Sequence, residues 1–229
     1  MTAFSVLQTD VRNFTLDLPA ETDALVPDFI VKAIRDAEVR HNFRYMEAEV
    51  ALVTTVDTRI VDTVPPLWKA RLTDPYVLLD DGTTREFEWA PSASEMIRRY
   101  DNDTDDDGDP EFLFEDQTNF SVYPLPDGDS DYTDGEYRIY VPYYAFSAAL
   151  SLDTDTNWMT NNMRWYVTYA AAGEACLMNR DSVTASNLLT RAETQFQLGV
   201  KQDKKSKATR RLTLAPRRAV YGPARGIRR

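Results

Sequence analysis

The sequence predicts an α+β protein, in which a helical bundle is combined with a small antiparallel β domain and a basic C-terminal tail. Residues 158–200 repeat apolar side chains at helical spacing in two consecutive runs, which indicates a hairpin of two long helices. Residues 47–56 and 137–144 instead alternate apolar and polar side chains, as strands with one buried face do. Residues 201–229 carry eleven basic side chains and one acidic one. We therefore expect a single folded domain over 1–200, followed by an extended basic tail.

The N-terminal region is expected to contain one helix of the bundle. Residues 1–22 show no clear period, so an extended arm or a short strand is expected there. Pro27 suits the first turn of a helix, where a backbone N–H has no partner within the helix. Apolar side chains then recur at helical spacing, which predicts a first helix over about 27–44. These side chains are Phe29, Ile30, Ala33, Ile34 and Ala37.

A β region is expected over about 47–146. Its first strand corresponds to the alternating segment that ends near Val56. The dipeptide Asp81-Gly82 separates the short runs 76–79 and 85–89, and such a dipeptide favours a two-residue hairpin turn. The two runs are therefore expected to pair as antiparallel strands.

The remainder of the β region contains a short helix and three further strands. Ser92 or Ser94 can cap the helix, which is expected to end near Tyr100. The strands are expected near 112–115, 120–123 and 137–144. In the last of these, one face is formed by Tyr137, Ile139, Val141 and Tyr143.

The C-terminal helices of the folded domain are expected at about 158–179 and 182–200. Asp181 or Ser182 can accept hydrogen bonds from the free amides at the start of the second helix. The run Ala170–Gly173 has almost no side-chain bulk, so a neighbouring backbone can approach closely there. We expect the first helix of the chain to pack on both helices of this hairpin.

The charge of the chain is divided sharply. Residues 1–200 hold 15 basic and 36 acidic side chains, a net charge of −21, whereas residues 201–229 carry +10. An acidic body repels nucleic acid, so we expect no DNA binding by the body. No apolar run reaches the roughly 20 residues that span a bilayer, and the N-terminus lacks the pattern of a secretory signal. No membrane association is therefore expected.

The sequence offers no enzyme and no cofactor site. His41 is the only histidine, and no Gly-x-Ser-x-Gly nucleophile motif accompanies it. One histidine and one cysteine are too few for a zinc site of the usual composition. Near the end of a helix, His41 is expected to interact with helix-end carbonyls. Cys176 lies on the apolar side of a predicted helix, where an inert core thiol is expected.

An acidic loop resembles half of a calcium site. Asp103, Asp105 and Asp107 alternate and are followed by Gly108, as in the first half of an EF-hand loop. The twelfth position, which should be a bidentate Glu, is Phe114. A solvated acidic loop is therefore the favoured interpretation, and a calcium-dependent surface-binding module stays as an alternative.

The order of several short motifs is similar to that of a known family. In chain order they are Phe29-Ile30-x-x-Ala33-Ile34, the strand Glu47–Val56, Ala90-Pro91-Ser92 with Met96, Gly108-Asp109-Pro110-Glu111-Phe112, Val122–Gly128, Tyr143-Tyr144 and Asn157-Trp158-Met159. Over about residues 25–200 this order resembles the head-to-tail adaptor (connector or gatekeeper) proteins of tailed bacteriophages, including those like tail tubular protein A. The acidic insertion at 101–107 and the pair Pro65-Pro66 depart from the family pattern.

The resemblance implies a structural virion protein that assembles in the host cytoplasm and occupies the head–tail interface. Such adaptors form a homo-oligomeric, twelve-fold ring beneath the portal protein, extend the DNA channel and contact the next tail or nozzle component. An acidic lumen would let duplex DNA pass without specific binding. Two alternatives are another virion component, such as a tail terminator or minor capsid protein, and the calcium-dependent module.

The tail 201–229 is expected to dock on the portal, as the tails of similar adaptors do. Its segments 211–214 and 219–221 are short enough to add as strands to a partner's sheet edge, while the arginines attach to acidic surface. A nucleic-acid-binding tail is the rival interpretation. The docking residues are expected to be Arg210, Arg211, Leu212, Leu214, Arg217, Arg218, Val220 and Tyr221.

Overall fold

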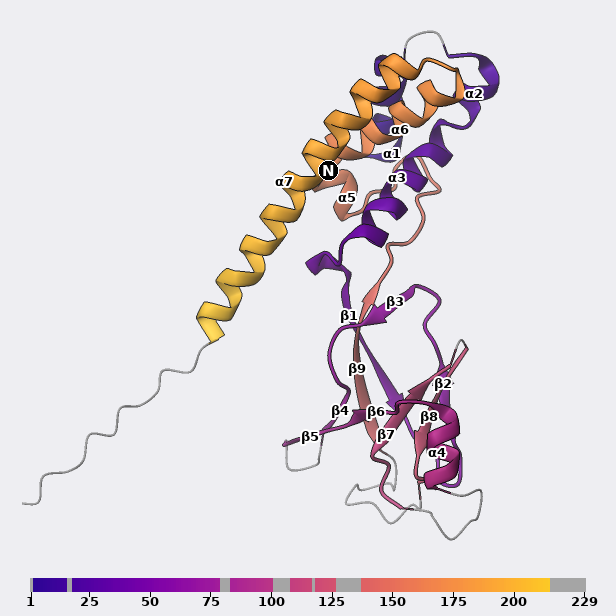
Figure 1. The fold of residues 1–229 in the computed structure, drawn as a ribbon, viewed down its shortest axis with the longest axis vertical. Coiled ribbons are helices and arrows are strands. Elements are labelled where there is room, and N and C mark those ends of the chain that lie inside the picture. Colours follow the sequence, from indigo (N-terminus) through magenta and orange to yellow (C-terminus); the bar gives the residue numbers. More distant parts are fainter. Residues whose placement is uncertain are drawn as a thin grey trace, which may run out of the picture.

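The computed structural model describes residues 2–15, 18–78, 83–100, 108–116, 118–126 and 137–214. It confirms the α+β fold, with a helical bundle at one end of the molecule and a β domain at the other (Figure 1). The helices of the bundle are α1 (Phe4–Thr15), α2 (Ala20–Ala24), α3 (Val26–Arg40), α5 (Trp158–Asn162), α6 (Arg164–Met178) and α7 (Ser182–Leu214).

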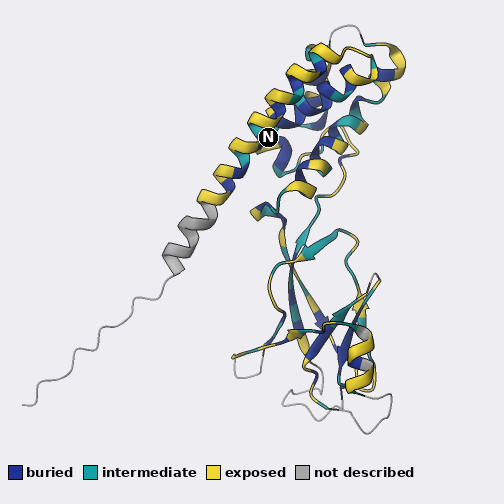
Figure 2. Ribbon diagram, viewed as in Figure 1, coloured by how far each residue is buried: buried dark blue, intermediate teal, exposed yellow. Residues whose placement is uncertain are grey.

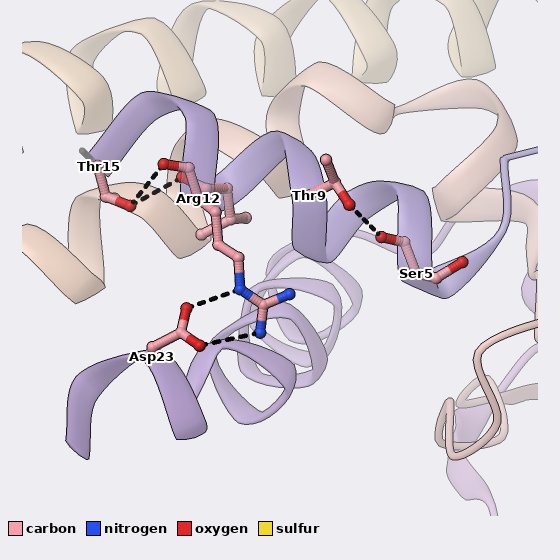
Figure 3. Close-up of polar contacts among 6 residues, drawn as sticks. Ser5, Thr9, Arg12, Thr15 and Asp23 are labelled. Carbon is pink, nitrogen blue, oxygen red and sulfur yellow. Dashed lines mark hydrogen bonds and ion pairs between the residues drawn. The ribbon is translucent and has the colours of Figure 1, made fainter. Parts of the chain in front are cut away.

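The expectation of an extended arm at the N-terminus is wrong, because α1 and α2 occupy that region. Phe4, Leu7 and Val11 of α1 follow helical spacing and are buried against the bundle. This three-residue stripe is too short to stand out from the polar residues around it. Arg12 of α1 pairs with Asp23 of α2 at 2.6 Å, which joins the two helices (Figure 3).

Helix α3 confirms the predicted first helix and the place of Pro27 in its first turn. Its buried stripe includes Ile30, Ile34 and Ala37, whereas Phe29 is only half-buried. The helix ends at Arg40 rather than near residue 44, because the backbone turns extended at His41. A short 3-10 helix, η1 (Arg44–Met46), then leads into the β domain.

The predicted hairpin is present as α5, α6 and α7. The helix expected over 158–179 is interrupted at Met163, which divides α5 from α6. Asp181 caps α7 as expected, since its carboxylate accepts a 3.1 Å hydrogen bond from the amide of Thr184. The close approach at Gly173 is also confirmed, because a Cβ there would lie 2.8 Å from Cγ of Leu189.

Helix α6 is the centre of the bundle, with α1, α3 and α7 packed against it. The first predicted helix therefore packs mainly on one member of the hairpin. Figure 2 shows buried residues on the inner sides of these helices and a largely exposed outer side of α7. Cys176 of α6 is buried in this core, as expected, and burial raises the pKa of its thiol.

The β domain consists of two sheets with a shared core. In the first sheet, β9 (Arg138–Ala145) pairs with β1 (Glu47–Val53) on one edge and with β3 (Trp68–Arg71) and β4 (Tyr76–Leu78) on the other, and β4 pairs with β5 (Thr84–Glu86). The second sheet has the order β2 (Ile60–Thr63), β8 (Asn119–Tyr123), β7 (Phe112–Glu115) and β6 (Glu88–Trp89). The core between them contains Leu52, Val77, Leu113, Phe120 and Ile139.

Most of the predicted strands are confirmed, although one of them is divided into two. The run expected as one strand at 85–89 forms β5 and β6, which belong to different sheets and are separated by the buried Phe87. β4 and β5 pair antiparallel, as the Asp81-Gly82 turn predicts, although residues 79–82 lie outside the described part. Ser92 caps α4 (Ala93–Arg99) by accepting a 3.1 Å hydrogen bond from the amide of Glu95.

Candidate assembly surfaces

Helix α7 is anchored to the body beyond the predicted end of the folded domain. Asp203 is buried, and its Oδ1 accepts a 2.9 Å hydrogen bond from the backbone amide of Arg44. Its Oδ2 lies 3.1 Å from Nε2 of His41, the residue that ends α3. Asp203 is the only acid of residues 201–229, and it belongs to the packed body. The boundary expected at residue 200 therefore falls within a continuous helix.

The expectation that His41 interacts with the helix-end carbonyls is wrong. The imidazole meets the Asp203 carboxylate, whereas the helix-end carbonyls receive the ammonium group of Lys69 from β3. Lys69 Nζ donates to the carbonyl oxygen of Glu38, and lies 3.3 Å from that of His41. The partial burial of Lys69 lowers the pKa of its ammonium group. Lys69 thus supplies a hydrogen-bond donor and a positive charge to the carbonyl groups at the C-terminus of α3, where a cation is favourable.

After Asp203, α7 leaves the bundle as a basic arm, defined here as residues 204–214. It contains five basic side chains and no acidic one. Figure 1 shows this part of α7 running past the end of the bundle and diverging from the β domain. Among the predicted docking residues, Arg210, Arg211, Leu212 and Leu214 belong to this helix. Residues 211–214 are thus helical in the chain by itself, and their addition as a strand to a partner's sheet edge stays a prediction.

The other predicted docking residues, Arg217, Arg218, Val220 and Tyr221, lie outside the described residues, as does the segment 219–221. A helix at 211–214 was not recognised because the apolar stripe of α7 stops near Val200. Beyond that point the sequence contains helix-forming Lys and Arg without apolar periodicity. Such a stretch is compatible with either a helix or a disordered segment.

A buried carboxylate joins the bundle to the β domain. Glu38 of α3 is fully buried and accepts a 2.8 Å hydrogen bond from Tyr45 Oη and a 3.1 Å bond from the amide of Ser147. Burial, followed by the nearby Glu38 charge, raises the pKa of the Tyr45 phenol. Arg35 places its guanidinium 4.2 Å from the ring centroid of Phe146, at the end of β9. This junction fixes the segments that enter and leave the β domain.

A groove lies over α6 where α3 and α7 separate. We call it the α3–α7 groove, and its volume is about 360 Å³. It is lined by Ala33, Asp36, Val39, Arg40, Tyr166, Ala170, Glu174, Leu189, Ala192 and Glu193. On its rim Arg40 pairs with Glu193 at 2.7 Å. Lys32 pairs with Glu174 at 2.9 Å, and this hydrogen bond raises the pKa of Lys32. Val39 is 61% exposed beside these charges.

The acidity of the body is concentrated in the β domain. Residues 47–146 hold 24 acidic and seven basic side chains, a net charge of −17, so the remainder of residues 1–200 carries only −4. The candidate calcium ligands Asp103, Asp105 and Asp107 lie outside the described residues. Glu115, the first carboxylate after Phe114, pairs with Arg71 at 2.9 Å. The described part of the chain contains no cluster of metal-ligating side chains.

Sequence reasoning singled out neither the anchor at Asp203, nor the junction at Glu38, nor the α3–α7 groove. Each depends on residues that are far apart in the chain, so no local spacing marks them. The one available signal was Asp203 itself, a single acid within a strongly basic segment.

An exposed groove lined by apolar and charged side chains, together with a projecting basic helix, is typical of proteins that assemble with others. The family model described as SU10 adaptor protein matches residues 1–220, so the chain belongs to the SU10 adaptor protein family. It is therefore a structural adaptor protein of a bacteriophage, a virion component that contacts other virion proteins, and its family is not an enzyme family. No curated protein matches the chain. Among the described residues, no helix is long and apolar enough to cross a membrane.

Proposed function

We propose that this protein is the head-to-tail adaptor that joins the portal to the tail and extends the DNA channel. The observation that carries the proposal is the basic arm, which projects from a buried anchor at Asp203. From Asp203 to Leu214 a helix extends about 17 Å, at about 1.5 Å per residue. The helix of the arm runs beyond the end of the bundle, and its residues are basic in the sequence. We assign the arm, with the basic residues that follow it in the sequence, to docking on the portal.

The partner of the arm is a protein surface with acidic groups. Arginine and lysine on a helix attach to carboxylates, and this attraction weakens with salt. The arm remains anchored to a body whose β domain carries −17. This body opposes the approach of duplex DNA, so the protein is a poor candidate for a DNA-binding role. In a ring, the same acidity allows DNA to slide past without binding.

The ring is expected to be twelve-fold, with the tail or nozzle component bound on the side away from the portal. The junction at Glu38 supports a rigid ring subunit, because a buried, hydrogen-bonded carboxylate holds the β domain to the bundle. Force on one end of the molecule is then transmitted to the other.

The test compares portal capture by the full chain and by a chain ending at residue 205, which keeps Asp203. Light scattering and negative-stain images of each chain mixed with portal rings report binding and symmetry. We expect the full chain to form a ring on the portal, and the shortened chain to lose capture while melting at the same temperature. Normal capture by the shortened chain would exclude the arm as the docking element.

A duplex DNA titration tests the rival nucleic-acid role of residues 201–229. The proposal predicts that binding of the full chain to DNA at physiological salt is negligible next to its binding to the portal. Tight DNA binding that is lost on ending the chain at residue 205 would favour the rival role instead.

A further inference from the structure

The two sides of helix α6 carry different exposed surfaces. On one side lies the α3–α7 groove, whose floor includes Ala170. On the other side Trp165 is 47% exposed. Trp165 and Ala170 are five positions apart, so they lie about 140° apart around a helix of 3.6 residues per turn. The bundle therefore presents a hollow and a protruding aromatic side chain in nearly opposite directions.

Trp165 is held in place without being covered. Its ring stacks on Tyr169 at a centroid distance of 5.8 Å and meets Phe14 edge-on at 6.4 Å. No described residue accepts a hydrogen bond from its indole nitrogen. A fixed tryptophan with an unpaired N–H is the kind of side chain that anchors protein interfaces.

Helix α7 also exposes an apolar side chain and a cation away from the α3–α7 groove. Leu198 is 53% exposed and lies nine positions from Leu189 of the groove, on the opposite side of the helix. Gly199, the next residue, contacts Met163, which precedes Trp165 by two residues, so Leu198 and Trp165 lie at a similar level along the bundle. Arg191 also lies away from the groove and forms no salt bridge with a described residue. We call Trp165, Arg191 and Leu198 the Trp165 surface.

We propose that the Trp165 surface of one copy seats in the α3–α7 groove of the next copy, an inference that rests on the proposed ring. The groove offers apolar floor to Trp165 and Leu198, with the exposed Val39 at its edge. Asp36 in the groove forms no salt bridge with a described residue, so an anion is available for the partner's Arg191. The carboxylate of Asp36, or that of Glu174, can accept a hydrogen bond from the indole N–H of the partner's Trp165.

This contact has the geometry that a ring requires. It joins two different surfaces of identical chains, so it is heterologous, and repeated heterologous contacts close into a ring or continue as a filament. The groove continues into a shallower depression over Leu177, Ser186 and Thr190, with Leu189 and Glu193 common to both. The interface thus has room to spread toward Leu177, near the end of α6 that is farther from Trp165.

Three exposed-surface variants test the contact without disturbing the core. Asp36→Arg, Arg191→Glu and the double variant are compared with the wild type by light scattering over a concentration series, with and without portal rings. Each single reversal should raise the concentration for half-assembly roughly tenfold or more, as at interface hot spots. The double variant should recover assembly, since the opposite charges meet again between copies.

Trp165→Ala should weaken assembly similarly. Leu152→Ser is the control, because Leu152 is 64% exposed and lies outside both surfaces and outside the depression beside the groove. A chain with Asp36→Cys and Arg191→Cys should give a ladder of disulfide-linked oligomers on oxidation, whereas the single cysteine variants should not pass the dimer. If the wild type assembles and neither the reversals nor Trp165→Ala change it, this interface is overturned while the adaptor function stands. If the wild type stays monomeric even with portal, the proposed function itself fails, and this interface with it.

Discussion

The carboxylate of Asp203 accepts a 2.9 Å hydrogen bond from the backbone amide of Arg44, and this contact fixes the point at which α7 leaves the body. The same carboxylate lies 3.1 Å from the imidazole of His41. A buried acid with two partners from the α3–β1 connection sets the direction of the basic arm that follows. The anchor and the arm are therefore different parts of one helix, with opposite charge.

We predict that shortening the chain has two distinct effects on stability. Ending it at residue 205 should leave the urea midpoint unchanged, because Asp203 remains. Ending it at residue 200 should lower the free energy of unfolding by about 1–3 kcal/mol, since the amide of Arg44 loses its acceptor. Asp203→Asn, which keeps an acceptor oxygen, should cost less than Asp203→Leu. Equal midpoints for both shortened chains would show that the anchor contributes nothing.

We predict that Glu38 holds the bundle and the β domain together. Glu38→Ala should cost about 1–3 kcal/mol, because the amide of Ser147 and the hydroxyl of Tyr45 lose a buried acceptor. Hydrogen exchange should accelerate in the segment after β9 more than in α6. Asp28→Ala, an exposed change on the same helix, is the matched control. Uniform acceleration across the whole chain would mean that Glu38 acts on global stability alone.

The sequence was sufficient for the elements whose buried stripe is long. The alternation of Tyr137, Ile139 and Val141 predicted β9 correctly, because each second residue faces the shared core. It was insufficient for α1, whose stripe has only three buried apolar residues. It also failed for the end of α7, where the sequence continues without apolar periodicity.

The site was harder to predict than the fold for a physical reason. The His41–Asp203 and Arg40–Glu193 contacts each join α3 to α7 across more than 150 positions of the chain, and charged partners carry no periodic signal. The basic composition of the tail was evident, but its helical form to Leu214 was not. Composition thus indicated that a charged arm exists, and only the packing of α7 indicated where it starts.

We predict that Gly173 must stay small for α6 and α7 to remain in contact. A Cβ at this position would lie 2.8 Å from both Cγ and Cδ2 of Leu189. Gly173→Leu should destabilise the protein by about 1–3 kcal/mol, as overpacking does. Gly173→Ala should cost less, because the gain in helix propensity partly offsets the contact and Leu189 borders the open groove. Thermal melting of both variants checks the order, and a Leu variant as stable as the wild type would contradict it.

We predict that calcium does not stabilise the protein. The twelfth position is Phe114, and the first carboxylate after it, Glu115, is engaged by Arg71 at 2.9 Å. A ligand that binds only the native state would raise the melting temperature by mass action. The melting temperature should be the same in chelator and in millimolar calcium. A clear rise with calcium, abolished by Asp103→Asn, would revive the surface-binding module.

We predict that the protein loses stability as the pH rises above about 10, the usual pKa of tyrosine. Burial raises the pKa of Tyr45, and it raises that of Tyr166 to about 12. The unfolded chain therefore loses these phenol protons before the folded chain does, so the stability present below pH 10 falls as the pH approaches the folded values. Lys69 acts in the opposite direction, because its lowered pKa adds stability as the pH rises toward its unfolded value. Urea midpoints measured from pH 8 to 12 should decline above pH 10, and the decline should be shallower for Tyr166→Phe. An identical slope in that variant would exclude Tyr166 as a source of the pH dependence.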